Sequence, residues 1–183
     1  MPRHVALLRG INVGGHRVKM DRLRDLFDAL GFADVATFIA SGNVLFVDDE
    51  EDIDVLRERI EAHLAAQLGY PVATFLRSPA QLAEIVHADL PPMRAPGSDP
   101  VSHYVMFLRE AAEDMARNRL EPLNSPTDDF HFSGTEVHWR IRSKLSESPL
   151  FGGGFERATR DIPNTMRNVT SLTRLLAKTG WTE

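Results

Sequence analysis

The sequence predicts an α+β protein made of two ferredoxin-like units, each a split βαβ arrangement around an antiparallel sheet, with an added C-terminal helix. Three observations lead to this prediction. Up to residue 76, β-rich runs and amphipathic helical patterns follow one another in the order β-α-β-β-α-β. A proline-rich stretch then interrupts the chain at residues 89–100, and a more degenerate version of the same order follows it.

The first half contains four predicted strands and two predicted helices. The strands are short apolar or β-branched runs at residues 5–8, 34–40, 43–47 and 72–76. The helices carry apolar residues at helical spacing over residues 20–30 and 53–68, and each ends at a glycine. Between the second and third strands, Ser41-Gly42-Asn43 has the composition of a hairpin turn.

The predicted domains are a ferredoxin-like domain over residues 1–77, a helix and proline-rich linker over 78–100, and a second domain with the C-terminal helix over 101–183. Residues 89–100 hold four of the eleven prolines. Proline neither continues a helix nor donates to a sheet, so this segment predicts a boundary.

In the second half, strands are predicted at residues 102–109 and 164–167, and helices at 110–119, 149–160 and 169–179. A hairpin around Ser133-Gly134 shows the clearest alternation in the chain. Its predicted core face carries Phe130, Phe132, Val137, Trp139 and Ile141, and its predicted polar face carries His131, Glu136, His138 and Arg140.

The composition is that of an ordinary globular protein: 183 residues, 43% hydrophobic and 26% charged. No apolar run approaches the roughly 20 residues of a membrane span. Because the chain has no cysteine, disulfides, thiol nucleophiles and thiolate zinc sites are excluded, and a reducing cytoplasm is expected. We expect no cofactor and no membrane partner, and either a monomer or a homodimer.

The net charge of −5 is distributed unevenly. Residues 1–24 carry six basic side chains and one acidic, and residues 137–183 carry eight basic and four acidic. The negative total argues against nonspecific binding of nucleic acid, whereas the two basic ends keep that function open as an alternative. The acidic run at residues 48–54 lacks the glycine and closing glutamate of a calcium loop, and is interpreted as the start of a helix.

The glycine-rich loop after the first strand is the main candidate for ligand binding. Such a loop ahead of a helix can present backbone N–H groups to a phosphate. Gly10 and Gly15 have P-loop spacing, but His16 and Arg17 replace the lysine and hydroxyl residue of that motif, and no dinucleotide fingerprint is present. Two interpretations stay open: a loop that binds an anion with help from Arg9, Arg17 and Lys19, and a loop whose glycines only provide positive φ.

The predicted topology places this loop and the Ser41-Gly42-Asn43 turn at one rim of the first sheet, because the first and third strands are antiparallel neighbours. The candidate ligand-binding residues combine cations with small and amide side chains, which suit phosphate or carboxylate. They are Arg9, Gly10, Asn12, Gly14, Gly15, Ser41, Asn43, Ser143, Lys144, Arg167 and Asn168. Asn168 also fits the N-cap of the final helix.

No catalytic residue or metal site is predicted. The chain contains no Gly-x-Ser-x-Gly or Ser-x-x-Lys motif. His131, His138 and Glu136 share one predicted face, but the histidine spacing matches no common metal motif, so a solvated or packed strand face is the preferred interpretation. The first and third strands also lack the paired aromatics of an RNA-recognition sheet.

Four segments carry a resemblance to a known family. They are LRGINVGG at 8–15 with Lys19, Met20 and Leu23; SGNV at 41–44 with Phe46; SKL at 143–145; and TMRNV at 165–169. Together they resemble the signature blocks of an uncharacterised bacterial family, catalogued as domain of unknown function 1697. In the last block Met166 and Val169 replace a Thr and a Trp of the family pattern. The resemblance implies two ferredoxin-like units and no assigned activity.

Three functions are consistent with these observations. The first is a protein that holds a small anionic ligand at the basic glycine-rich loop, either as an enzyme or as a binding protein. The second is a nucleic-acid-binding protein that uses the basic N- and C-terminal segments. The third is a dimerising protein-interaction module that uses an open sheet face.

Overall fold

A computed structural model describes residues 1–39, 42–109 and 112–180 of the chain. The protein is of the α+β class, with two four-stranded antiparallel sheets and accompanying helices. It divides into two compact units: Met1–Ala83 with Leu175–Glu183, and Glu84–Arg174. Of the helices in the described part, none combines the length and apolarity that a membrane span requires.

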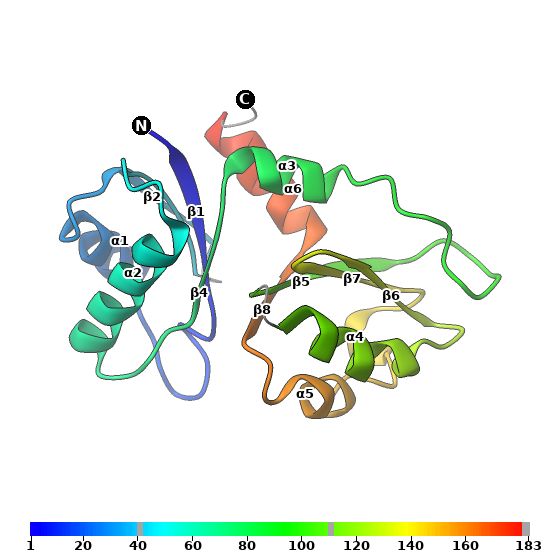
Figure 1. The fold of residues 1–183 in the computed structure, drawn as a ribbon. Helices are drawn as coiled ribbons and strands as arrows, with labels where there is room; N and C mark the ends of the chain where they lie inside the picture. Colours follow the sequence, from blue (N-terminus) through cyan, green and yellow to red (C-terminus); the bar gives the residue numbers. More distant parts are fainter. Residues whose placement is uncertain (40–41, 110–111, 181–183) are drawn as a thin grey trace. The chain divides into compact units, whose positions relative to one another are not determined.

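The first unit has the predicted order of elements (Figure 1). Its elements are β1 (Arg3–Leu8), α1 (Met20–Asp28), β2 (Ala33–Phe38), β3 (Asn43–Val47), α2 (Ile53–Leu68), β4 (Thr74–Arg77) and the start of α3 (Pro79–Val86). The sheet order is β2-β3-β1-β4, with every neighbouring pair antiparallel. The prediction that β1 and β3 are antiparallel neighbours is therefore confirmed.

Helices α1 and α2 cover one face of this sheet because their apolar residues recur at helical spacing. Leu23 and Phe27 of α1 and Leu56 and Ile60 of α2 are fully buried against strand residues such as Phe46. The acidic run before α2 starts the helix as predicted: the Asp52 carboxylate accepts hydrogen bonds from the backbone N–H groups of Asp54 and Val55.

The second unit repeats both the element order and the sheet order of the first. Its elements are β5 (Ser102–Leu108), α4 (Glu113–Leu120), the short helix η2 (Glu121–Leu123), β6 (Asp128–Ser133), β7 (Glu136–Ile141), the short helix η3 (Leu145–Glu147), α5 (Gly154–Thr159), β8 (Asn164–Asn168) and the start of α6 (Val169–Thr179). The sheet order is β6-β7-β5-β8. Figure 1 shows α4 and α5 on the same side of this sheet.

The alternation predicted for the second hairpin is confirmed. Phe130 pairs with Trp139 on the core face, and His131 pairs with His138 on the opposite face. The Trp139 indole packs against both Phe130 and Phe155, with ring centroids at 5.3 and 4.8 Å. Its Nε1 donates to the buried Asp128 carboxylate at 2.9 Å, which satisfies the polar end of an otherwise apolar side chain.

The compact units have different boundaries from the predicted domains at 77 and 101. The proline-rich segment belongs to the second unit, because the Arg142 guanidinium binds its backbone: Nε donates to the Ser98 carbonyl and Nη2 to the Ala95 carbonyl, both at 2.6 Å. The C-terminal part of α6, from Leu175, belongs to the first unit. There the Lys178 ammonium lies 5.6 Å from the centre of the Phe38 ring.

Two predicted helices are shorter than expected. The helix predicted at 110–119 is α4, Glu113–Leu120, and residues 110 and 111 lie outside the described part. The helix predicted at 149–160 is reduced to α5, Gly154–Thr159, because three consecutive glycines begin at Gly152 and glycine is a poor helix former.

Candidate functional site

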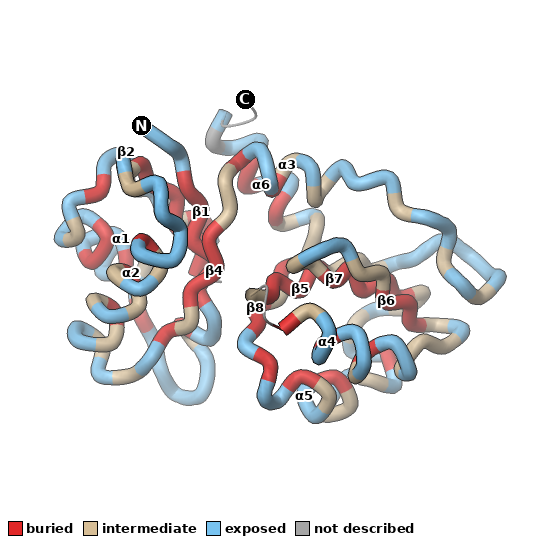
Figure 2. Tube along the Cα trace, in the orientation of Figure 1, coloured by how far each residue is buried: buried red, intermediate tan, exposed pale blue. Residues whose placement is uncertain are grey.

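The glycine-rich loop joins β1 to α1 and is mostly exposed (Figure 2). Its first residue is fixed to the sheet, because the Arg9 N–H donates to the Ala73 carbonyl at 2.9 Å. Farther along, the Val18 N–H donates to the Asn12 side-chain oxygen at 2.6 Å, which closes the loop on itself. The segment is therefore an ordered loop with a tethered base and a tethered end.

Three glycines give this loop its shape. Gly10, Gly14 and Gly15 have φ of +63°, +68° and +88°, a region that other L-residues rarely adopt. A Cβ atom added at any of the three would meet no atom within 4 Å. The space beside their backbone is therefore open, and a ligand can approach the main chain closely there.

The loop and the β2–β3 turn lie at the same rim, as the topology predicted. The Leu8 N–H donates to the Gly42 carbonyl at 2.9 Å. Gly42 has φ of +76°, and a Cβ added to it would lie 2.7 Å from Cγ2 of Ile11, which is itself buried. Only glycine therefore lets the turn approach the loop this closely. Ser41 lies outside the described residues.

The two asparagines of the predicted site have structural contacts. Asn12 holds the loop through the Val18 N–H, as described above. Asn43 is 1% exposed, and its Nδ2 donates to the Phe38 carbonyl at 3.2 Å, which closes the hairpin turn. Both residues lie at the rim, but these contacts explain their presence without a ligand.

The positive charge of the loop is exposed. Arg9, Arg17 and Lys19 are all solvent-accessible, and the loop contains no acidic residue before Asp21. Arg17 and Lys19 form no ion pair with any residue that the structure describes. An anion at the loop would therefore not have to displace a carboxylate from these two side chains.

The remaining candidates belong to the second unit. Ser143 and Lys144 follow β7, while Arg167 and Asn168 end β8. Both strands are antiparallel to β5 and therefore run parallel to each other, so both pairs lie at one end of the sheet. Lys144 is exposed. The Ser143 carbonyl accepts from the Ser102 hydroxyl at 2.9 Å, and the Ser143 hydroxyl donates to the Lys144 carbonyl at 3.1 Å.

Arg167 and Asn168 differ in their surroundings. Arg167 is 7% exposed, and its Nη1 donates to the Thr165 hydroxyl at 2.7 Å and to the Met166 carbonyl at 3.0 Å. Burial lowers the pKa of its guanidinium to about 10. The Asn168 oxygen accepts from the Thr170 N–H at 2.8 Å, so Asn168 has the helix-capping role that the sequence indicated.

Sequence reasoning missed a contact between two histidines on the polar face of the second sheet. His103 Nε2 and His138 Nδ1 lie 3.0 Å apart across β5 and β7. Burial first, then the nearby Arg140 guanidinium, lowers the pKa of His103 to about 4. Burial and then His103, His131 and Arg140 lower the pKa of His138 to about 4 as well. No trio of His, Asp or Glu suited to a metal ion occurs among the described residues.

The histidine pair predicts a pH dependence of stability. The unfolded chain protonates both rings below about pH 6.5, whereas the folded chain does so only near pH 4. The free energy of unfolding is therefore unaffected above about pH 6.5 and decreases as the pH falls from about 6.5 to about 4. We expect the melting temperature to fall by several degrees over this interval, and to fall less in H103Q/H138Q. The prediction would be contradicted if the melting temperatures of the wild type and H103Q/H138Q fell equally with decreasing pH.

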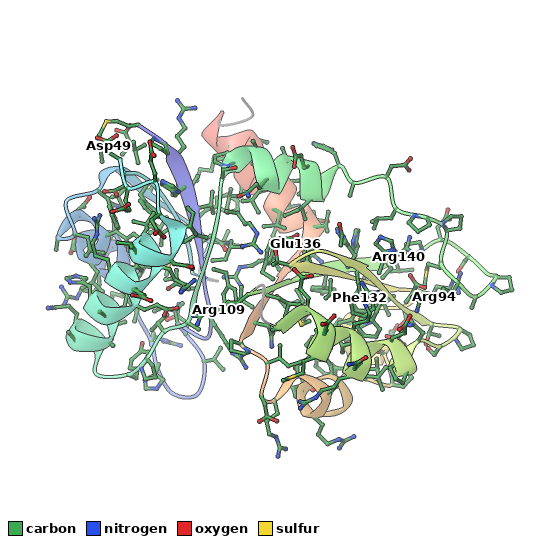
Figure 3. All side chains as sticks on the ribbon, viewed as in Figure 1. Asp49, Arg94, Arg109, Phe132, Glu136 and Arg140 are labelled. Carbon is green, nitrogen blue, oxygen red and sulfur yellow. The ribbon has the colours of Figure 1, made fainter. Side chains whose placement is uncertain are left out.

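The sequence reasoning also missed a buried ion pair beside these histidines. The Arg140 Nη2 lies 2.6 Å from the Asp129 Oδ2, with side chains 9% and 5% exposed. Asp129 also accepts from the Arg94 N–H at 3.1 Å, and Arg140 Nη1 donates to the Pro91 carbonyl at 2.7 Å. Arg94 and Arg140 both lie at the β6–β7 side of this unit (Figure 3). In the sequence, the only sign of this ion pair was the position of Arg140 on the predicted polar face of the hairpin.

Comparison with known proteins decides the family. The model of the family described as protein of unknown function (DUF1697) matches residues 1–138. The chain belongs to this family. The match includes the glycine-rich loop and the SGNV turn, and ends before Ser143, so the two late motifs lie outside it.

The chain is also similar to a solved structure. The chain is 25% identical to the conserved bacterial protein SP0830 from Streptococcus pneumoniae, with a TM-score of 0.75, over 97% of this chain and 98% of that one. No curated protein matches the chain. The family description gives no activity, so the function has to be argued from the chain's own residues.

Proposed function

We propose that this protein binds a small anionic ligand, one that bears a phosphate or carboxylate group, at the glycine-rich loop of its first unit. One observation carries the proposal: exposed Arg17 and Lys19 follow a loop whose three left-handed glycines leave open space beside the backbone. Successive N–H groups in such turns form concave anion sites, and cationic side chains add charge-assisted hydrogen bonds.

The contacts that hold the loop in place support this proposal. The first residue of the loop forms a backbone hydrogen bond to Ala73, and the Asn12 side chain accepts a hydrogen bond from the backbone near the end of the loop. The Ile11 side chain is buried. A ligand that meets an ordered loop does not have to order it, and that entropy cost is therefore avoided. Neither Arg17 nor Lys19 is needed for these contacts, so both are available to a ligand.

The test is a titration with inorganic phosphate and pyrophosphate, followed by thermal unfolding and calorimetry. At a tenfold excess over Kd, a ligand stabilises the folded state by about 1.4 kcal/mol, which raises the melting temperature by about 3–6 °C in a chain of this size. We expect this shift in the wild type and its loss in R17E/K19E. Glutamate at position 19 is favourable at the start of α1, so unfolding would not explain the loss.

The matched control is R160E/R174E. It reverses two exposed arginines of the second unit, and so has the same net charge as R17E/K19E. The control should retain the phosphate shift. The absence of a shift in the wild type, or equal shifts in all three proteins, would overturn the proposal. K144E in the same titration tests the second-unit candidates, and an unchanged affinity would remove Lys144 from the ligand site.

The nucleic-acid alternative gives a different result. Binding through basic segments weakens steeply with salt, by orders of magnitude between about 50 and 200 mM for a protein with six or more phosphate contacts. Part of the basic C-terminal segment, up to Arg174, belongs to the second unit, and the basic N-terminal segment belongs to the first. An oligonucleotide that binds with that salt dependence, with no response to phosphate, would favour this alternative.

Two further proposals concern the fold assignment and the cellular location of the protein. Each unit has the element order β-α-β-β-α-β and an antiparallel sheet whose third and first strands are central, which supports a ferredoxin-like assignment. The lack of cysteine supports a cytoplasmic location.

A further inference from the structure

The feature that carries a further inference is an aromatic stack at the side of the glycine-rich loop. The rings of His16 and Tyr70 are stacked, with centroids 3.7 Å apart and planes inclined by 22°. Tyr70 follows the end of α2, and its hydroxyl donates to the Ile11 carbonyl at 3.4 Å. The stack therefore rests on a half-buried tyrosine that is itself attached to the loop.

The His16 ring has one aromatic neighbour in the described part of the chain. His16 is exposed, and Tyr70 is the only ring it contacts among the residues that the structure describes. Tyr70 covers one of the two faces of a planar imidazole, so the other can accept a second planar group. Arg17 and Lys19 come one and three residues later, within about 11 Å along an extended chain.

We propose that the ligand carries a planar aromatic ring, which stacks on the exposed face of His16 while its phosphate binds at Arg17 and Lys19. This inference rests on the proposed function and narrows it to aromatic phosphates, with nucleoside monophosphates as the principal candidates. The preformed His16–Tyr70 stack lowers the cost of binding, because the ring that receives the ligand is already oriented.

The experiment compares adenosine 5′-monophosphate, phenyl phosphate and ribose 5-phosphate by calorimetry. Stacking of one base on an aromatic side chain raises affinity by about fivefold to more than a hundredfold. We therefore expect wild-type protein to bind the nucleotide at least about fivefold more tightly than ribose 5-phosphate. Phenyl phosphate tests whether the site accepts any aromatic ring or requires a nucleobase. If phenyl phosphate binds about as tightly as the nucleotide, the site accepts aromatic phosphates in general.

Variants of the stack separate ligand binding from loop structure. H16A should abolish the preference for the nucleotide and leave the affinity for ribose 5-phosphate unchanged, whereas H16F should retain the preference. Y70F keeps the ring and removes only its hydrogen bond to Ile11, so it should also retain the preference.

The failures of the two proposals are distinguishable. If ribose 5-phosphate and the nucleotide bind equally well, or if H16A keeps the preference, then the stacking inference is overturned and anion binding stands. If neither compound nor inorganic phosphate binds, both proposals are overturned.

Discussion

Replacing Asp129 by alanine is expected to lower the free energy of unfolding by about 3–5 kcal/mol. The substitution leaves the Arg140 guanidinium buried without its carboxylate, which lies 2.6 Å away in the wild type. It also removes the acceptor of the Arg94 N–H, so the proline-rich segment loses a contact with the sheet. Urea denaturation of the wild type and D129A measures the loss directly.

Two controls define the cause. D129L/R140M removes both charges together, and we expect it to lose less stability than D129A, because no uncompensated charge remains. D21A removes the exposed ion pair of Asp21 with Arg24, and is expected to lose about 1 kcal/mol or less. If D129A lost as little as D21A, the Asp129–Arg140 pair would have to be accessible to water, which would contradict its burial.

Replacing Gly42 by alanine is expected to lower the free energy of unfolding by about 2–4 kcal/mol, from two additive causes. Its φ of +76° is unfavourable for alanine, and the new Cβ would lie 2.7 Å from the Ile11 side chain. The loop and the turn would then have to separate. Thermal unfolding measures the loss, and weaker phosphate binding should accompany it if the loop forms the proposed site.

Gly14 provides the matched control. Its φ of +68° is similar, but an added Cβ would meet nothing within 4 Å, so G14A should lose only the conformational part, about 1–2 kcal/mol. The double variant G42A/I11A should lose less than the sum of the two single variants, because the clash disappears with the Ile11 side chain. Strict additivity would show that the close approach of the turn to the loop has no energetic effect.

Much of the fold could be predicted because its signals are local. The final helix was predicted at 169–179 and is Val169–Thr179, because Leu172, Leu175 and Leu176 lie on one helical face and Asn168 caps the start. The alternation around Ser133-Gly134 assigned the two faces of the second hairpin correctly, because side chains alternate strictly along a strand.

The common rim of the glycine-rich loop and the β2–β3 turn was also predictable, because it follows from the order of the strands. The roles of individual asparagines were not. A sequence does not distinguish an asparagine that binds a ligand from one that holds a loop. Asn12 is assigned to the second role only because the structure places the Val18 N–H beside its side-chain oxygen. Ligand binding by the candidate residues stays a prediction.

The contacts that the sequence did not predict join strands that are distant in the chain. His103 meets His138 only because β5 pairs with β7 in one register, which a shift of one residue would destroy. The proline-rich segment was interpreted as a linker from its composition. Its carbonyl groups are bound by Arg140 and Arg142, and nothing in the local pattern around those arginines indicates so distant a partner.

The division of α6 between the units has a consequence for biosynthesis. Residues 1–83 leave the ribosome early, but Leu175 and Leu176, which are buried and belong to the same unit, are made about ninety residues later. The intervening unit is continuous in the chain. The unit that is translated first therefore cannot form its last contacts until the end of the chain has been made.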